Sequence, residues 1–197
     1  MEIRKQYSFD GMHIVRNCSS DRCKFSIHAH HYVVEVFLTA DALDNGMMCV
    51  DFGLLKGPVK DFIGSFDKSY SLWSKESYSF SNFIDITQTR IVTMPVSPSA
   101  EAYSYMFMKY INEIINNTEF NNGEVNPKLL KVRVHETTTG YAESNRGDLV
   151  NKSLPQITLE DIEFSDTIKR SWKNQNLFDD LINSKHFVNP VVKQQIK

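Results

Sequence analysis

The stretch HAHHYVVEVFL, residues 28–38, is dominated by β-branched and aromatic side chains, a composition typical of a β-strand. Strand side chains point alternately to two faces, so every second residue shares a face. One face begins with two imidazoles and continues with apolar side chains, in the order His28, His30, Tyr32, Val34, Val36 and Leu38. His31 lies on the opposite face. The stretch therefore predicts a strand whose apolar face ends in a pair of histidines.

Further strands are predicted on both sides of this one. An alternating segment over residues 3–13 gives the strand before it. The turn signal at 44–46 and the apolar run 47–50 follow it, in the pattern of an antiparallel ladder. Residues 84–95 and 130–135 give two more strands. The core-facing residues of the last strand are Leu130, Val132 and Val134.

Two helices separate these strands. Asp51 can cap a helix that Gly57-Pro58 interrupts, so the helix either kinks there or begins at Pro58. Ser97-Pro98 begins a second helix, whose apolar stripe runs to Ile114 and is interpreted as core. Residues 67–82, rich in Ser and Tyr, are predicted to be a loop. This element order predicts an α+β domain, with an antiparallel four-stranded sheet and two helices on one face.

The chain length of 197 residues predicts one domain with an appendage. We expect the domain to span residues 1–144 and a C-terminal extension to span 145–197. The extension is polar, with helical periodicity only in short pieces. We expect it to be helical and to pack on the core or on a neighbouring subunit.

The composition is that of a soluble globular protein, with 41% hydrophobic and 23% charged residues. The net charge of −2 and the scattered Lys and Arg residues give no basis for nucleic-acid binding. No apolar run approaches the roughly 20 residues of a membrane span, and the first residues lack the apolar core of a secretory signal. The three cysteines are too few for a disulfide framework, so we expect a cytoplasmic protein with reduced thiols.

Three histidines, His13, His28 and His30, are placed to form a metal site, because His13 ends the strand that precedes the pair. Three protein ligands and one open position are how catalytic zinc is held. Imidazoles also suit Fe, Ni and Cu, and such histidines are often ordinary core or surface residues, so these interpretations stay open here. Cys23 is close enough in sequence to reach a substrate on the metal. Glu136 continues an apolar strand face, a costly position for an unused carboxylate.

Five short motifs occur in an order that resembles one known family. They are FDGMH at 9–13, the block from Cys23 to His30, GMMCVDFGLLK at 46–56, PSAE at 98–101 and VHET at 134–137. Together they resemble the 6-pyruvoyl-tetrahydropterin synthase and 6-carboxy-tetrahydropterin synthase family, whose bacterial branch works in the queuosine and 7-deazapurine pathway. The resemblance implies the tunnelling fold. Subunits would join their sheets into an oligomeric barrel, commonly a hexamer of two trimers, with active sites at subunit interfaces.

The resemblance assigns roles residue by residue. His13, His28 and His30 fall on the zinc ligands of the family, and Cys23 falls on its catalytic cysteine. Glu136 falls on the carboxylate that anchors the pterin ring, which agrees with its place on the strand face.

The PSAE motif matches the family pattern P-T-x-E with Ser99 in place of threonine, which makes Ser99 and Glu101 candidates at the substrate site. Glu101 is either a partner of the site or a favourable acid in the first turn of a helix.

A larger departure from the family pattern lies at residues 67 and 68. The family carries an Asp-His pair that works with the cysteine in proton transfer, and here Asp67 matches but Lys68 replaces the histidine. Lysine is the poorer base, because its ordinary pKa is about 10.4 against about 6.5 for histidine.

The resemblance implies a zinc-dependent lyase that acts on 7,8-dihydroneopterin triphosphate. The products implied for the bacterial branch are 6-carboxy-5,6,7,8-tetrahydropterin, acetaldehyde and triphosphate. The sister reaction instead stops at 6-pyruvoyl-tetrahydropterin. Lys68 also leaves open a pterin-binding module with little turnover, and a structural β-barrel oligomer with incidental histidines is a third interpretation. His31 or His135 could replace the missing histidine in space.

Overall fold

The main sheet has seven strands in the order β7-β6-β2-β1-β3-β4-β8, in a computed structural model that describes residues 1–190. The strands are β1 (Glu2–His13), β2 (His28–Thr39), β3 (Ser69–Trp73), β4 (Ile91–Met94), β6 (Lys128–His135), β7 (Tyr141–Asn145) and β8 (Glu163–Phe164). β1, β2, β6 and β7 are antiparallel, whereas β3 runs parallel to β1 and β4 runs parallel to β3. A separate parallel pair joins β5 (Thr118–Phe120) to β9 (Phe187–Asn189).

The α+β class is confirmed, but the sheet is mixed, so the expectation of four antiparallel strands is wrong. β3 lies inside residues 67–82, which were expected to form a loop, and its first four residues are buried. Ser69 and Ser71 do alternate with Tyr70 and Leu72, but the strand is only five residues long within a stretch rich in Ser and Tyr. The strand expected over 84–95 is shorter, because the helix α4 (Tyr78–Thr87) precedes β4. Residues 47–50 form bends and no strand.

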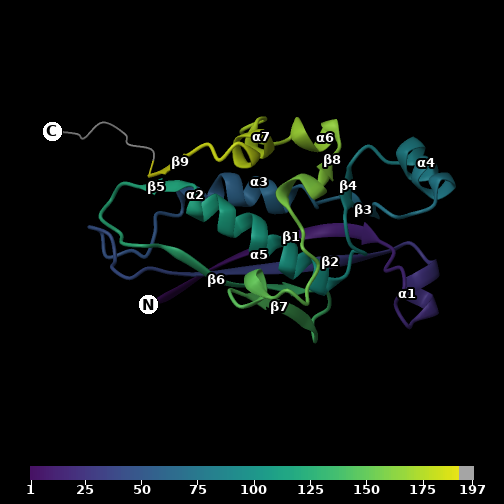
Figure 1. Ribbon diagram of the computed structural model, residues 1–197, viewed down its shortest axis with the longest axis horizontal. Helices are drawn as coiled ribbons and strands as arrows, with labels where there is room; N and C mark the ends of the chain where they lie inside the picture. The colour runs from purple at the N-terminus through teal and green to yellow at the C-terminus, as the bar shows by residue number, and fades with distance from the viewer. Residues whose placement is uncertain (191–197) are drawn as a thin grey trace.

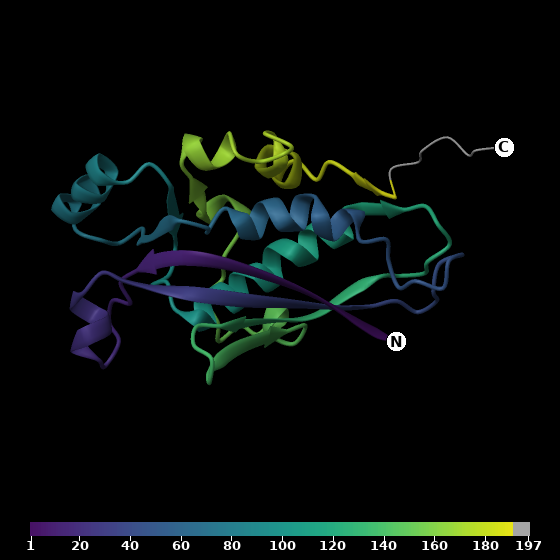
Figure 2. The same ribbon diagram turned by 180° about the vertical axis from the view of Figure 1, so that it is seen from behind.

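Three helices cover one face of the antiparallel strands (Figures 1 and 2). They are α2 (Gly53–Lys56), α3 (Pro58–Gly64) and α5 (Ala100–Asn116). The first expected helix is divided at Gly57, and Pro58 begins its second part. Ser99, rather than Ser97, caps α5, since its hydroxyl accepts from the Ala102 amide at 3.2 Å. No helix within residues 1–190 is long and apolar enough to cross a membrane.

A β-bulge corrects the predicted inner face of β6. The pairing of β2 with β6 shifts between Phe37 and Leu38, so that Leu38 pairs with Leu129. Leu129 is fully buried, whereas Leu130 is only partly buried. The prediction that Leu130 faces the core is therefore wrong, because the extra residue of a bulge interrupts the alternation of faces.

Of residues 145–190, those up to Leu159 lie along α5 and β7, and those from Ile162 to Leu181 pack over α3 on the side away from β1 and β2 (Figures 1 and 2). Besides β8 and β9, residues 145–190 hold two single-turn 3-10 helices, η1 (Asp148–Val150) and η2 (Leu159–Asp161), and two α-helices, α6 (Asp166–Lys169) and α7 (Leu177–Ile182). Their buried side chains join the main core and are Ile162, Phe164, Ile168, Trp172, Leu177 and Leu181. Residues 191–197 of the expected extension lie outside the described residues. The division of the chain at residue 144 stays a prediction.

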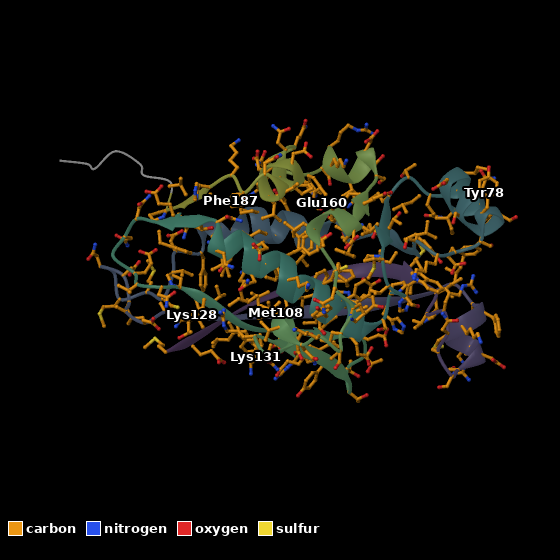
Figure 3. All side chains as sticks on the ribbon, viewed as in Figure 1. Tyr78, Met108, Lys128, Lys131, Glu160 and Phe187 are labelled. Carbon is orange, nitrogen blue, oxygen red and sulfur yellow. The ribbon has the colours of Figure 1, made fainter. Side chains whose placement is uncertain are left out.

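Two short helices stand at one end of the molecule (Figures 1 and 2). α1 (Asp21–Phe25) lies in the connection from β1 to β2, and α4 lies in the connection from β3 to β4. α1 has no buried residue, and α4 has only Ile84. Figure 3 shows Tyr78 on α4 far from Met108, which lies in the middle of the buried helix α5. Hydrophobic packing therefore contributes little to the position of α1, whereas α4 packs through Ile84 and Phe80 on a small second cluster with Tyr70, Leu72 and Ile91.

Candidate metal centre

The pairing of β1 with β2 brings the three predicted histidines together. In the antiparallel register His13 lies opposite His28, and Gly11 lies opposite His30. One nitrogen atom from each of His13, His28 and His30 lies within 4.8 Å of the other two. The imidazoles lie at the same end of the two strands, where β1 ends and β2 begins.

Two of the imidazoles are oriented by backbone carbonyl groups. His13 Nδ1 lies 2.7 Å from the carbonyl oxygen of Pro98, and His28 Nδ1 lies 2.9 Å from that of Ser26. A carbonyl oxygen only accepts, so each Nδ1 carries the proton and donates. The lone pair of each Nε2 is left for another ligand, as in many metal-binding histidines.

His13 is the buried member of the group, with no exposed surface. The pKa of His13 is lowered to about 4, chiefly by burial; the Pro98 hydrogen bond opposes this shift, and the neighbouring His28 and His30 add to it. His13 is therefore neutral near pH 7, the form that binds metals. Three convergent imidazoles fit a zinc ion, and they equally fit other late transition metals.

Glu136 also reaches this group. Its Oε1 lies 3.7 Å from His13 Nε2 and 3.9 Å from His30 Nε2. It accepts a hydrogen bond of 3.2 Å from the buried hydroxyl of Tyr32. Burial raises the pKa of Tyr32, and the charges of Tyr103 and Glu136 raise it further, so the hydroxyl stays a donor. The carboxylate is therefore held beside the Nε2 atoms of His13 and His30.

Cys23 lies on α1 and is not part of the three-histidine group. It is partly buried, and its carbonyl oxygen accepts from the Val15 amide at 3.0 Å. This hydrogen bond folds α1 back on the chain that follows His13, so the sulfur-bearing residue is tethered close to the end of β1.

Asp67 and Lys68 lie at the other edge of β1. The Asp67 carboxylate accepts from the Asp10 amide at 3.0 Å, and the Lys68 amide donates to the Asp10 carbonyl at 2.6 Å. Among residues 1–190 no hydrogen bond or ion pair joins either side chain to Cys23 or to the three histidines. His31 is nearby, because its Nδ1 lies 2.7 Å from the Asp10 carboxylate. His135 instead contacts Glu35 at 3.0 Å.

Ser99 and Glu101 are placed by the first turn of α5. The Ser99 hydroxyl is used as the helix cap, and Glu101 is exposed. The residue of this motif that touches the histidine group is Pro98, through its carbonyl oxygen. Sequence reasoning missed this contact, because a backbone acceptor leaves no side-chain signal. The contribution of Tyr32 could have been predicted from the sequence, because Tyr32 follows His30 on the same face of the strand.

Comparisons with known proteins agree with this geometry. A family model described as 6-pyruvoyl tetrahydropterin synthase matches residues 2–147. The 6-carboxy-5,6,7,8-tetrahydropterin synthase of Helicobacter pylori (strain ATCC 700392 / 26695) is 41% identical over 183 residues, which cover 92% of each chain. The enzyme of the same name from Rickettsia typhi is 31% identical over 102 residues, 51% of this chain and 72% of that one.

Solved structures show the same fold at lower identity. A catalytic-residue variant of Plasmodium vivax 6-pyruvoyltetrahydropterin synthase superposes with a TM-score of 0.55 at 17% identity, covering 74% of this chain and 97% of the other. The Caenorhabditis elegans 6-pyruvoyl tetrahydropterin synthase gives a TM-score of 0.51 at 18% identity, with 74% and 94% covered. The family match, the close relatives and the shared fold lead to one conclusion: this chain belongs to the 6-pyruvoyl tetrahydropterin synthase family and is a lyase-type enzyme.

Proposed function

We propose that this protein converts 7,8-dihydroneopterin triphosphate to 6-carboxy-5,6,7,8-tetrahydropterin, acetaldehyde and triphosphate, in queuosine and 7-deazapurine biosynthesis. The observation that carries the proposal is the convergence of His13, His28 and His30 in a chain 41% identical to 6-carboxy-tetrahydropterin synthases over nearly its full length. The named activity belongs to those relatives, and its assignment to this chain is the proposal.

The three imidazoles would hold zinc through their free nitrogen atoms. When bound, zinc supplies Lewis acidity that makes the hydroxyl groups of the substrate side chain easier to deprotonate. His13 and His28 keep their orientation through Pro98 and Ser26, so the donor set is organised before a ligand arrives.

Cys23 would remove a proton from the substrate side chain, since the Val15 amide holds the Cys23 carbonyl and keeps this residue near the end of β1. Glu136 would hold the pterin ring, because one carboxylate can accept from an exocyclic amine and an adjacent ring N–H together. Tyr32 donates to the carboxylate and fixes its direction. Ser99 and Glu101 are proposed to support the substrate site through the first turn of α5.

Asp67 and Lys68 would complete the proton relay across a subunit interface. β3 pairs with β1 only at Gly11–His13, which leaves the rest of the long β1 edge without a strand beside it in the described chain. β7 is the opposite edge of the sheet. Free edges of this kind pair with other strands, so we propose that copies join edge to edge into a barrel, as a hexamer of two trimers. Asp67 lies on the free edge and would thus face a neighbouring subunit.

The test is to incubate zinc-loaded protein with 7,8-dihydroneopterin triphosphate and to identify the products by mass. We expect acetaldehyde and 6-carboxy-tetrahydropterin. We also expect Cys23→Ala to abolish both products while the bound zinc, measured by elemental analysis, stays unchanged. A 6-pyruvoyl product would replace the proposed reaction with the sister reaction. If the protein binds pterin but does not turn it over, its function would be that of a pterin-binding module. Lys68 in place of the expected histidine is the sequence feature that favours this alternative.

A further inference from the structure

Arg16 lies at the centre of a set of contacts that no motif predicts. Its guanidinium group donates to both carboxylate oxygens of Glu76, with Nη2 at 3.2 Å from Oε2. Its Nη1 donates to the Lys24 carbonyl oxygen at 2.8 Å, and its planar group lies 5.1 Å from the centre of the Phe80 ring. Its own carbonyl oxygen accepts from the Ser97 hydroxyl at 3.1 Å. We name this set the Arg16 clasp.

The clasp joins three separate segments of the chain. Arg16 and Lys24 belong to the connection between β1 and β2, which carries α1. Glu76 lies in the turn before α4, and Phe80 lies on α4. Both short helices stand at the same end of the molecule (Figures 1 and 2). The clasp therefore fixes the weakly packed segment of α1 against the start of α4, and the Ser97 hydroxyl adds the segment before α5.

Apart from the bond of the Val15 amide to the Cys23 carbonyl oxygen, other interactions do little to hold α1. None of its five residues is buried, and no side chain caps its N-terminus. Within residues 1–190, Arg16 is the one side chain of segment 15–27 with a hydrogen bond or ion pair to a residue outside that segment. By bonding the Lys24 carbonyl, Arg16 satisfies an end group of α1 that the short helix leaves free.

The electrostatics of the clasp favour a defined geometry. The Glu76 side chain is only 7% exposed, and that of Arg16 is 22% exposed, so water screens the pair little. A planar guanidinium on a carboxylate fixes direction as well as distance, and a lysine in its place would not. The Lys24 carbonyl is one residue from Cys23.

We propose that Arg16 is a positioning residue that, through Glu76 and the Lys24 carbonyl, sets where Cys23 stands relative to His13, His28 and His30. The inference rests on the proposed function, in which Cys23 takes the substrate proton. Arg16 need not touch the substrate. A displacement of about 1 Å at a reacting group can reduce a rate by roughly 100-fold, so a loosened α1 acts on catalysis rather than on binding.

The test compares Arg16→Ala, Glu76→Ala, the double variant and Arg16→Lys with the wild-type protein. Arg22→Ala is the matched control. It also removes a positive charge, here from α1 itself, but the Arg22 side chain makes no hydrogen bond or ion pair among residues 1–190. Zinc content, kcat and KM for 7,8-dihydroneopterin triphosphate, and amide hydrogen exchange resolved by peptide are measured for each protein.

We expect Arg16→Ala to lower kcat by about 100-fold with little change in KM and with full zinc content. Amide exchange should rise in residues 14–27 and stay unchanged in β1 and β2. The double variant should lose no more than Arg16→Ala alone, Arg16→Lys should recover little, and Arg22→Ala should resemble wild type.

Unchanged exchange in residues 14–27 of Arg16→Ala would overturn the inference, and so would a kcat within twofold of wild type. Loss of zinc in step with activity would also overturn it, since Arg16 would then support the metal site as a whole. If the wild-type protein does not turn over the substrate, the proposed function fails by itself. The exchange measurement still decides whether Arg16 holds the helix of Cys23.

Discussion

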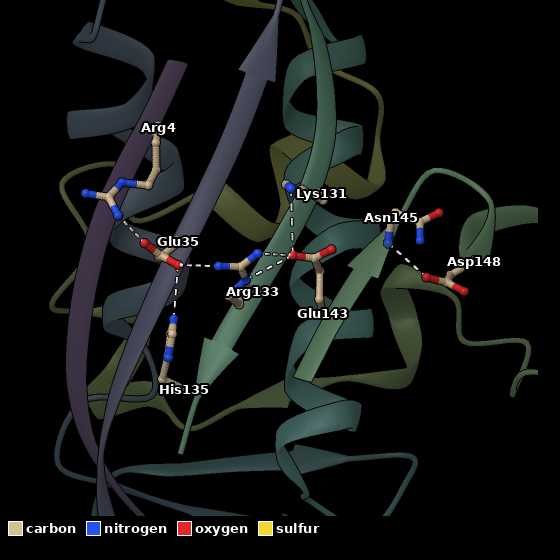
Figure 4. A network of polar contacts seen from close by, with 8 residues as sticks. All are labelled: Arg4, Glu35, Lys131, Arg133, His135, Glu143, Asn145 and Asp148. Carbon is tan, nitrogen blue, oxygen red and sulfur yellow. Dashed lines mark hydrogen bonds and ion pairs between the residues drawn. The ribbon is translucent and has the colours of Figure 1, made fainter. Parts of the chain in front are cut away.

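Glu35 offers a sharp test of how the sheet face opposite the helices is stabilised. Its side chain is 8% exposed and accepts from His135 Nε2 at 3.0 Å, from Arg133 Nη1 at 3.5 Å and from Arg4 (Figure 4). Burial on its own would raise the pKa of Glu35, but hydrogen bonds from His135 and Arg4 outweigh burial and lower the pKa below its usual range.

The cost of Glu35→Gln follows from the exposure of each partner. The Arg4 side chain is 53% exposed, so its ion pair is worth little. The His135 side chain is 28% exposed and its contact is short, which leaves one strong charge-assisted hydrogen bond. Such a bond contributes about 2 kcal/mol, so the free energy of unfolding should fall by about 2 kcal/mol at pH 7.

The loss should depend on pH. Because the folded pKa of Glu35 is depressed, its contribution is fully present above the unfolded value of about 4.3 and is lost as the pH falls through the folded value. The difference between wild type and Glu35→Gln should therefore shrink toward acid. The assay is urea unfolding from pH 7 down to about pH 2, well below the unfolded pKa of Glu35, at one protein concentration.

Glu143→Gln is the matched control. Glu143 pairs with Arg133 at 2.7 Å in the same network, and its side chain is 28% exposed, so we expect a loss below about 1 kcal/mol. A loss for Glu35→Gln that is equally large at acid pH would refute the electrostatic reasoning, and so would a loss no greater than that of the control.

Three further predictions concern single contacts. His28→Ala should weaken zinc binding by more than about 100-fold, whereas His31→Ala, on the opposite strand face, should leave zinc content unchanged in elemental analysis; equal losses would contradict the assigned ligand set. Lys68 has a φ of 51°, a backbone region that histidine tolerates, so the Lys68→His variant should fold normally. If this residue serves the proton relay, the substitution should raise kcat by about 100-fold, and an unchanged kcat would remove Lys68 from the mechanism. Trp172→Phe removes a buried hydrogen bond of 2.8 Å from Nε1 to Ser65 Oγ and should lower the free energy of unfolding by about 1–2 kcal/mol in urea titrations, and a neutral result would show that water replaces it.

Much of the fold was predictable because its central strands alternate regularly. β1 and β2 follow the expected pattern, and Gly57-Pro58 marked the break between α2 and α3. β3 was missed because its alternation covers only five residues, inside a stretch rich in Ser and Tyr that is typical of a loop. β8 is two residues long and depends on β4, so no local pattern could reveal it.

The candidate site was also predictable only in part. The clustering of His13, His28 and His30 was predictable, since their spacing and strand parity place them on one face. The roles of Cys23, Glu136, Asp67, Lys68, Ser99 and Glu101 stay predictions. The Pro98 carbonyl and the contacts of Arg16 come from segments far apart in sequence, and the pattern around either residue alone does not indicate them.

The packing of residues 162–181 on α3 also has a kinetic consequence. Trp172 bonds Ser65 across 107 positions of sequence, and Asn189 accepts from the Leu54 amide across 135 positions. Contacts of such high sequence separation require large loops to close, so we expect refolding over milliseconds to seconds rather than microseconds. Until the late segment arrives, the outer side of α3 presents apolar surface to water. Partly folded chains should therefore aggregate more readily than the native protein, and dilute refolding conditions should give the higher yield.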